Sequence, residues 1–235
     1  MIGSGCLTAV PWVSRGLVFG CCLEETGPGM SSGRLRFRIL GPLTAFADGE
    51  PLPVSGPKQR ALLALLLLNA NRVVSRERLL GELFVELRPT SADHALRNQM
   101  SRLRKALAAA GPNTPRLVTR PPGFLLRVEP GELDLDEFER LVADGREALA
   151  AGDPSSSARL LRSADALWSG RALADLDLEG LLRIEIERLE ELRLAAVEER
   201  IEAELALGQH RELVGELQAL SGEYPYRERF PAQLM

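Results

Sequence analysis

The segment 92–109 carries the residues best suited to chemistry, because a helix over this range separates apolar from polar side chains. Four apolar residues recur at helical spacing and form one stripe: Leu96, Met100, Leu103 and Leu107. The opposite face carries His94, Asn98, Ser101, Arg102 and Lys105, with Arg97, Gln99 and Arg104 on its flanks. Asn pairs bidentately with adenine and Arg with guanine, whereas Lys and Ser suit phosphates. The pattern predicts a helix that packs one side on a core and reads a DNA major groove with the other.

An ordinary solvated helix face is the alternative interpretation. Such a face usually mixes acids with bases. Here Asp93 is the only acid, and it stands at the predicted helix start, where the helix dipole favours a carboxylate. The charge pattern therefore favours contact with a polyanion.

A predicted hairpin follows this helix, with β-runs at 117–119 and 124–128. The turn between them is Arg120-Pro121-Pro122-Gly123, so Arg120 stands at a stiff tip. A basic tip beside a major-groove helix can enter the minor groove or hold a phosphate. A plain surface turn is the other interpretation of Arg120.

The elements that must position these residues begin with three short strands, at 35–39, 43–47 and 50–54, in an antiparallel sheet. Asp48-Gly49 is the hairpin turn between the last two, because both positions favour positive φ. Helices are predicted at 58–69, at 76–84 with Ser75 as N-cap, and at 92–109 with Ser91 as N-cap, the last preceded by a loop at 85–90. Residues 34–130 therefore predict an α+β winged helix-turn-helix domain with an N-terminal antiparallel sheet.

Residues 131–235 show only helical periodicity. Helices are predicted from Asp134 as an N-cap, from Asp153-Pro154 to Trp168, over 178–207, over 210–220 and from Tyr226. Helix pairs of this size resemble tetratricopeptide repeats, and an irregular helical bundle is the alternative. Because the sequence stops at Met235, we expect a shortened helical domain that exposes an apolar patch around Leu213, Leu217 and Phe230.

The charge is divided between these two parts. Residues 34–130 hold 16 Lys and Arg against 7 Asp and Glu, whereas residues 131–235 hold 12 against 24. A basic domain joined to an acidic one is typical of a nucleic-acid-binding module fused to a second module. A protein-interaction scaffold whose basic half is incidental is the competing class.

The first 33 residues are rich in Gly and Ser and have no period, so we expect a disordered or untranslated extension that is dispensable, with Met30 as an alternative start. The three cysteines, Cys6, Cys21 and Cys22, lack metal-ligand spacing and fit a reduced cytoplasm. No apolar run is long enough to span a membrane, so no membrane partner is expected.

An enzyme is not expected. The chain has only two histidines, His94 and His210, and lacks a phosphate loop, a nucleophile elbow and paired zinc ligands. The many carboxylates after residue 130 alternate with Arg on outward helix positions, as in a solvated face. Neither a metal nor a cofactor is predicted.

Several motifs together resemble the Streptomyces antibiotic regulatory protein family. They are Gly41-Pro42-Leu43, Gly56-Pro57-Lys58-Gln59-Arg60-Ala61-Leu62-Leu63-Ala64-Leu65-Leu66, Asn71-Arg72-Val73-Val74-Ser75, Ser101-Arg102-Leu103-Arg104-Lys105-Ala106-Leu107, Thr119-Arg120-Pro121-Pro122-Gly123-Phe124, Gly131-Glu132-Leu133-Asp134-Leu135 and Arg188-Leu189-Glu190-Glu191-Leu192-Arg193. The family joins an OmpR/PhoB-type winged helix to a bacterial transcriptional activation domain. The resemblance runs from about residue 35 to the last residue. Phe124 stands where Tyr is more usual, and the first 30 or so residues have no counterpart.

The resemblance implies activation of pathway-specific genes, often for secondary metabolites such as antibiotics, through direct repeats in DNA beside a promoter. It also implies that the loop 85–90, with Glu86 and Arg88, contacts RNA polymerase. Self-association through the helical domain is a further expectation. A shortened regulator that binds its DNA site without activating transcription is the alternative within the family.

Overall fold

The computed structural model describes residues 34–108, 115–177 and 180–235, which belong to one unit of the chain, 31–235. The predicted N-terminal extension, residues 1–33, lies outside the described residues. Within the described part, no helix is long and apolar enough to cross a membrane.

The first sheet is antiparallel, with strands β1 (Leu35–Arg38), β2 (Thr44–Ala47) and β3 (Glu50–Pro51) in that order. Asp48 and Gly49 form the turn with φ of 48° and 90°, which confirms the predicted hairpin. The third strand is shorter than predicted, because Pro51 and Pro53 leave too few N–H donors to continue a ladder. The inward side chains Leu35 and Phe37 are fully buried.

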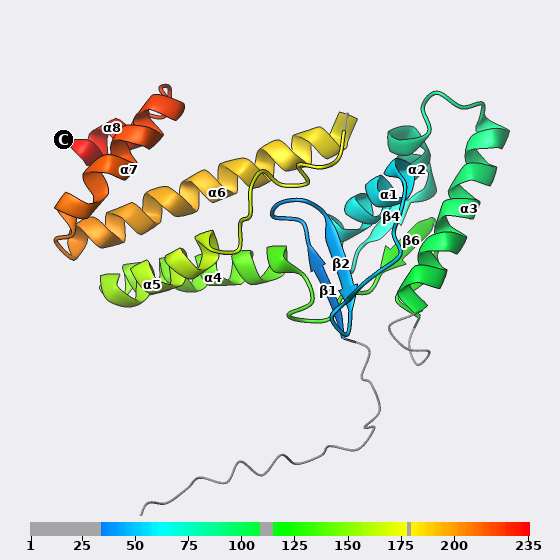
Figure 1. The fold of residues 1–235 in the computed structure, drawn as a ribbon, viewed down its shortest axis with the longest axis horizontal. Coiled ribbons are helices and arrows are strands. Elements are labelled where there is room, and N and C mark those ends of the chain that lie inside the picture. Colours follow the sequence, from blue (N-terminus) through cyan, green and yellow to red (C-terminus); the bar gives the residue numbers. More distant parts are fainter. Residues whose placement is uncertain (1–33, 109–114, 178–179) are drawn as a thin grey trace, which may run out of the picture. The chain divides into compact units, whose positions relative to one another are not determined.

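Three helices follow: α1 (Pro57–Leu67), α2 (Arg76–Leu83) and α3 (Pro89–Ala108) (Figure 1). Helix α1 is the central one, since seven consecutive apolar residues, 61–67, are all buried. The Ser75 side chain accepts a hydrogen bond from the Arg78 N–H at 3.2 Å, so its role as N-cap is confirmed.

Helix α3 begins three residues earlier than predicted, and Ser91 is not its N-cap. The Ala92 N–H already donates to the Arg88 carbonyl at 2.9 Å, so the helix is under way at Pro89. The fixed φ and missing N–H of proline suit the first turn of a helix. The predicted loop 85–90 is therefore the shorter segment Phe84–Arg88.

The second sheet contains the predicted hairpin, β5 (Leu117–Arg120) and β6 (Gly123–Leu126), and a strand that sequence patterning missed, β4 (Val73–Ser75). Its order is β4-β6-β5. Three residues are too few to show a period of two, so β4 becomes visible only through its pairing with β6 (Val74 opposite Phe124). This three-stranded sheet is called the wing below.

The rest of the described chain is helical: α4 (Asp134–Ala150), α5 (Pro154–Asp165), α6 (Gly180–Ala206), α7 (His210–Glu223) and α8 (Arg229–Leu234). Helix α4 packs on α5, α5 on α6, and α7 on α8. Asp153 caps α5 as predicted, by accepting from the Ser156 N–H at 3.0 Å. The helix ends at Asp165 instead of Trp168, and α8 starts at Arg229 instead of Tyr226.

Asp134 is not a helix cap. Leu133 occupies the N-cap position of α4, and the Asp134 carboxylate accepts from the backbone N–H groups of Ile39 and Leu40. A distant pair of donors has taken the place of the local ones.

The predicted apolar patch at the end of the chain is wrong. Leu213, Leu217 and Phe230 are 3%, 2% and 0% exposed, because α8 folds back and places Phe230 between α6 and α7. They form a small second core with Leu194, Val197 and Ile201. The main core is continuous from the first sheet through α1–α3 to α4–α6. The two sequence regions therefore share one apolar cluster.

Candidate nucleic-acid interface

Helix α3 has the two faces that its sequence predicts. The stripe Leu96, Met100, Leu103 and Leu107 is at most 3% exposed. His94, Arg97, Asn98, Ser101, Arg102 and Lys105 are all exposed. No hydrogen bond or ion pair to another side chain engages any of these six within the described residues. Their donors are therefore free for a ligand, and Figure 1 shows α3 at the outer edge of the ribbon, beyond α1, α2 and β6.

The one acid near this face is neutralised. The Arg76 Nε, at the start of α2, donates to the Asp93 carboxylate at 3.0 Å. Arg76 also donates its backbone N–H to the Pro122 carbonyl at 3.2 Å, which holds the hairpin turn against α2. Sequence patterning did not single out Arg76, because its partners are 17 and 46 residues away and no local signal marks them. The carboxylate that α3 itself carries in its first turns is therefore paired with an arginine.

Arg104, predicted on the flank of α3, connects that helix to the wing. Its Nη2 donates to the Thr119 hydroxyl at 2.7 Å and its Nε to the Leu117 carbonyl at 3.3 Å. Its guanidinium also lies over the Phe124 ring, 5.9 Å from the ring centre. Arg104 is therefore occupied within the fold, and it sets the position of the hairpin relative to α3.

Arg120 is exposed at the end of β5, opposite Gly123. Arg120 therefore lies in the wing, whereas the other predicted DNA-contacting residues lie on α3. Arg104 and Arg76 connect the wing to α3. A helix face and a basic hairpin end joined in this way can contact adjacent grooves of one duplex.

Gly123 is required for the wing to close. A Cβ at this position would lie 1.8 Å from the Val74 carbonyl oxygen in the neighbouring strand. We expect Gly123→Ala to destabilise the fold by roughly 1–3 kcal/mol, because backbone must move to admit the methyl group. Thermal unfolding followed by circular dichroism measures the change.

Gly81→Ala is the matched control. Gly81 lies in α2 with nothing within 4 Å of the added Cβ, so alanine is expected to be neutral or to stabilise the helix by about 0.5–1 kcal/mol. Equal melting temperatures for the two variants would show that β4 does not pack on the hairpin as described.

The loop Phe84–Arg88 precedes α3 and presents a different surface. Val85 is 77% exposed and Leu87 45% exposed. Glu86 and Arg88 are exposed as well. Two uncovered apolar side chains that alternate with two charged ones form a small surface suited to contact with another protein.

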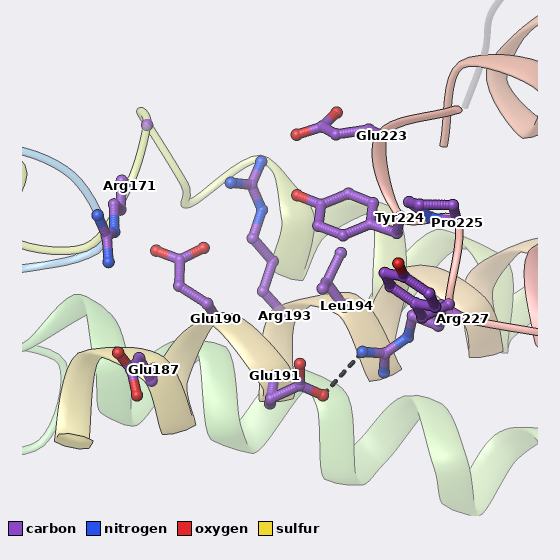
Figure 2. Close-up of a pocket in the computed structure, with 12 residues that line it drawn as sticks. Arg171, Glu187, Glu190, Glu191, Arg193, Leu194, Glu223, Tyr224, Pro225 and Arg227 are labelled. Carbon is purple, nitrogen blue, oxygen red and sulfur yellow. Dashed lines mark hydrogen bonds and ion pairs between the residues drawn. The ribbon is translucent and has the colours of Figure 1, made fainter. Parts of the chain in front are cut away.

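The helical region contains a hollow of about 1060 Å³ between the 170–171 turn, α6 and the α7–α8 connection (Figure 2). Its charges are mixed and partly paired: Arg227 contacts Glu191 at 2.7 Å, and Glu190 accepts from the Ala172 N–H at 2.8 Å. None of its lining residues is His, Cys or Ser. No cluster of three or more metal-ligating side chains exists among the described residues.

Two family models match the chain. The transcriptional regulatory protein C-terminal model covers residues 49–125, and the bacterial transcriptional activator domain model covers residues 133–235. The first contains α3 and most of the wing, and the second contains α4–α8.

Named relatives match over most of the chain. It is 39% identical over 218 residues to the regulatory protein AfsR of Streptomyces coelicolor, covering 90% of this chain and 21% of AfsR. It is 35% identical over 207 residues to the regulatory protein DnrI of Streptomyces peucetius, covering 86% of this chain and 76% of DnrI. The solved structure of Mycobacterium tuberculosis EmbR in complex with a low-affinity phosphopeptide superposes with a TM-score of 0.81 at 38% identity, over 86% of this chain and 54% of that one.

The chain spans about a fifth of AfsR and about half of the EmbR chain. It covers more than two thirds of DnrI. The α+β winged helix followed by a helical activation domain, predicted from the sequence, is confirmed by the EmbR structure. This chain belongs to the Streptomyces antibiotic regulatory protein family of transcription regulators, which pair an OmpR/PhoB-type DNA-binding domain with a bacterial transcriptional activator domain.

Proposed function

We propose that this chain binds promoter DNA with α3 and the wing and activates transcription of a specific set of genes. The observation that carries the proposal is the α3 face, where exposed Asn98, Arg102 and Lys105 have free donors while the opposite stripe is buried. In this assignment Asn98 and Arg102 discriminate bases. His94, Arg97, Ser101, Lys105 and Arg120 contact phosphates or the minor groove.

RNA polymerase is the proposed protein partner, and the loop Phe84–Arg88 is its proposed contact. Exposed Val85 and Leu87 supply apolar surface, and Glu86 and Arg88 supply charge. The DNA site is proposed to be a pair of direct repeats beside a promoter for secondary-metabolite genes, occupied by two copies that associate through their helical regions. The proposed setting is the cytoplasm, where such promoters lie.

The salt dependence of DNA binding tests the proposal. DNase footprinting on the DNA flanking the gene identifies the site, and fluorescence anisotropy then measures Kd at several salt concentrations. A protein that neutralises Z phosphates gives a log–log slope of about −0.9Z, so the three cations Arg97, Lys105 and Arg120 predict a slope of roughly −3 for each bound copy. A protein-interaction scaffold predicts almost no slope.

Arg97→Ala and Arg211→Ala form a matched pair for this measurement. Both side chains are exposed arginines without an ion pair in the described chain, one on α3 and one on α7. Arg97→Ala is expected to reduce the slope by about 1 unit, whereas Arg211→Ala leaves it unchanged. Equal effects of the two would show that binding follows overall charge and not the α3 face.

A further inference from the structure

The segment Ile39–Leu43, directly after β1, is held by side chains from the helical region. The Asp134 carboxylate accepts from the Ile39 N–H at 2.9 Å and from the Leu40 N–H at 3.1 Å. Burial raises the pKa of Asp134 above its ordinary value, against the opposing effect of these backbone donors and Arg38. The carboxylate is thus committed to this contact and withdrawn from solvent.

The other end of the segment is held in the same way. The Leu43 N–H donates to Asp175 Oδ1 at 2.7 Å, and its carbonyl accepts from Arg60 Nη2 at 2.8 Å. Arg60, on α1, also forms an ion pair with Asp175. A single residue of the helical region therefore binds both the segment and the central helix of the DNA-binding part.

The middle of the segment packs against Ser169. The Ser169 N–H donates to the Leu40 carbonyl at 2.8 Å, and the Leu173 N–H donates to the Ile39 carbonyl at 3.1 Å. A Cβ built on Gly41 would lie only 2.0 Å from the Ser169 hydroxyl oxygen. Glycine fits here because the Ser169 side chain fills the space that a Cβ on residue 41 would occupy. We call the segment 39–43 together with Arg60, Asp134, Ser169 and Asp175 the joint.

A second tie connects the wing to the start of the helical region. Arg116, directly before β5, binds Glu132 with two hydrogen bonds of 2.8 and 3.0 Å. Glu132 is 6% exposed, and its carbonyl accepts from the Phe37 N–H in β1 at 2.7 Å. The DNA-reading hairpin, β1 and the start of α4 are thus connected through hydrogen-bonded groups with little freedom to rearrange.

We propose that the joint positions the helical region for transcription activation, so that opening it abolishes activation while DNA binding survives. This inference rests on the proposed function. DNA contacts lie on α3 and the wing, and none of the joint residues belongs to either. In the proposed function, polymerase contacts the loop 84–88 while two copies associate through their helical regions, so activation requires both parts of the chain in one fixed arrangement. Arg60, Asp134 and Asp175 are positioning residues in this scheme.

Asp134→Ala, Asp175→Ala and the double variant test the joint in the full chain. Transcription in vitro is measured from the footprinted promoter at saturating occupancy, and operator Kd is measured separately. Activation is expected to fall about tenfold or more, with Kd within about twofold of the unchanged chain. Hydrogen exchange should become faster at the amides of residues 39, 40 and 43 while α3 stays protected. Asp175→Asn, which keeps an acceptor for the Leu43 N–H, is expected to recover part of the activation.

Glu139→Ala is the matched control, because Glu139 is an exposed acid on α4 without a partner in the described chain. It should change neither activation nor Kd. Full activation by the double variant would overturn the inference, and so would a loss of DNA affinity in proportion to the loss of activation. If the unchanged chain neither binds nor activates, the proposed function itself fails, and the inference fails with it.

Discussion

Asn98→Ala and Arg102→Ala are each expected to weaken binding to the cognate DNA site by roughly 1–3 kcal/mol, or about 5–150-fold in Kd. Both side chains are exposed on α3, opposite a stripe that the core fully buries, so neither change disturbs packing. The loss arises because a base edge keeps its donors and acceptors without the bidentate partner. Kd for random DNA should hardly change, since base-specific pairs contribute little there.

Lys105→Ala provides the contrast within the same helix. Lys105 is exposed and, as a compact charge, is expected to contact a phosphate. Its removal should weaken cognate and random DNA alike and reduce the salt slope by about 1 unit. If all three variants weaken both kinds of DNA equally, the recognition face has been assigned wrongly and α3 serves only as a charged surface.

The α3 face could be predicted because its information is local. An apolar residue at every third or fourth position defines the buried side, and the remaining residues must face outward. The caps Ser75 and Asp153 were predicted for the same reason, since each accepts from an N–H three residues ahead. A cap predicted from local sequence is therefore found in the structure unless a hydrogen-bond partner from a distant segment binds the same side chain.

Asp134 shows that competition. It has the residue type and place of an N-cap, but its carboxylate accepts from two N–H donors that lie 95 and 94 residues earlier in the chain. The β4 strand, the Arg76–Asp93 pair and the Arg104–Thr119 contact are hidden for a similar reason, because each exists only when distant segments meet. Sequence periodicity therefore predicted the helices, most of the strands and the outward face of α3, whereas β4 and the contacts that fix one element to another required the structure.

The end of the chain illustrates the same limit and leads to the second large effect. The helical spacing of Leu213 and Leu217, with Phe230 further along the chain, predicts apolar helix faces. It does not predict which residues cover them. In the structure α6, α7 and α8 cover them together, and Phe230 is 0% exposed. Beside this small core, two ion pairs connect the start of α8 to α6. Arg227, just before α8, pairs with Glu198, and Arg229, the first residue of α8, pairs with Glu202. These ion pairs set the position of a helix that is only six residues long.

Phe230→Ala is expected to destabilise the packing of α7 and α8 by roughly 3–5 kcal/mol, the usual effect of emptying a buried phenylalanine site. A six-residue helix has almost no stability of its own, so α8 should fray once its anchor is removed. Binding of a hydrophobic dye should rise and the helical signal should melt earlier. DNA affinity should stay within about twofold, because this core is separate from the one that supports α3.

Tyr226→Ala is the matched control, since Tyr226 is 98% exposed and its removal should change stability by less than about 0.5 kcal/mol. Equal dye binding and equal melting for the two variants would show that Phe230 does not hold α8 in place.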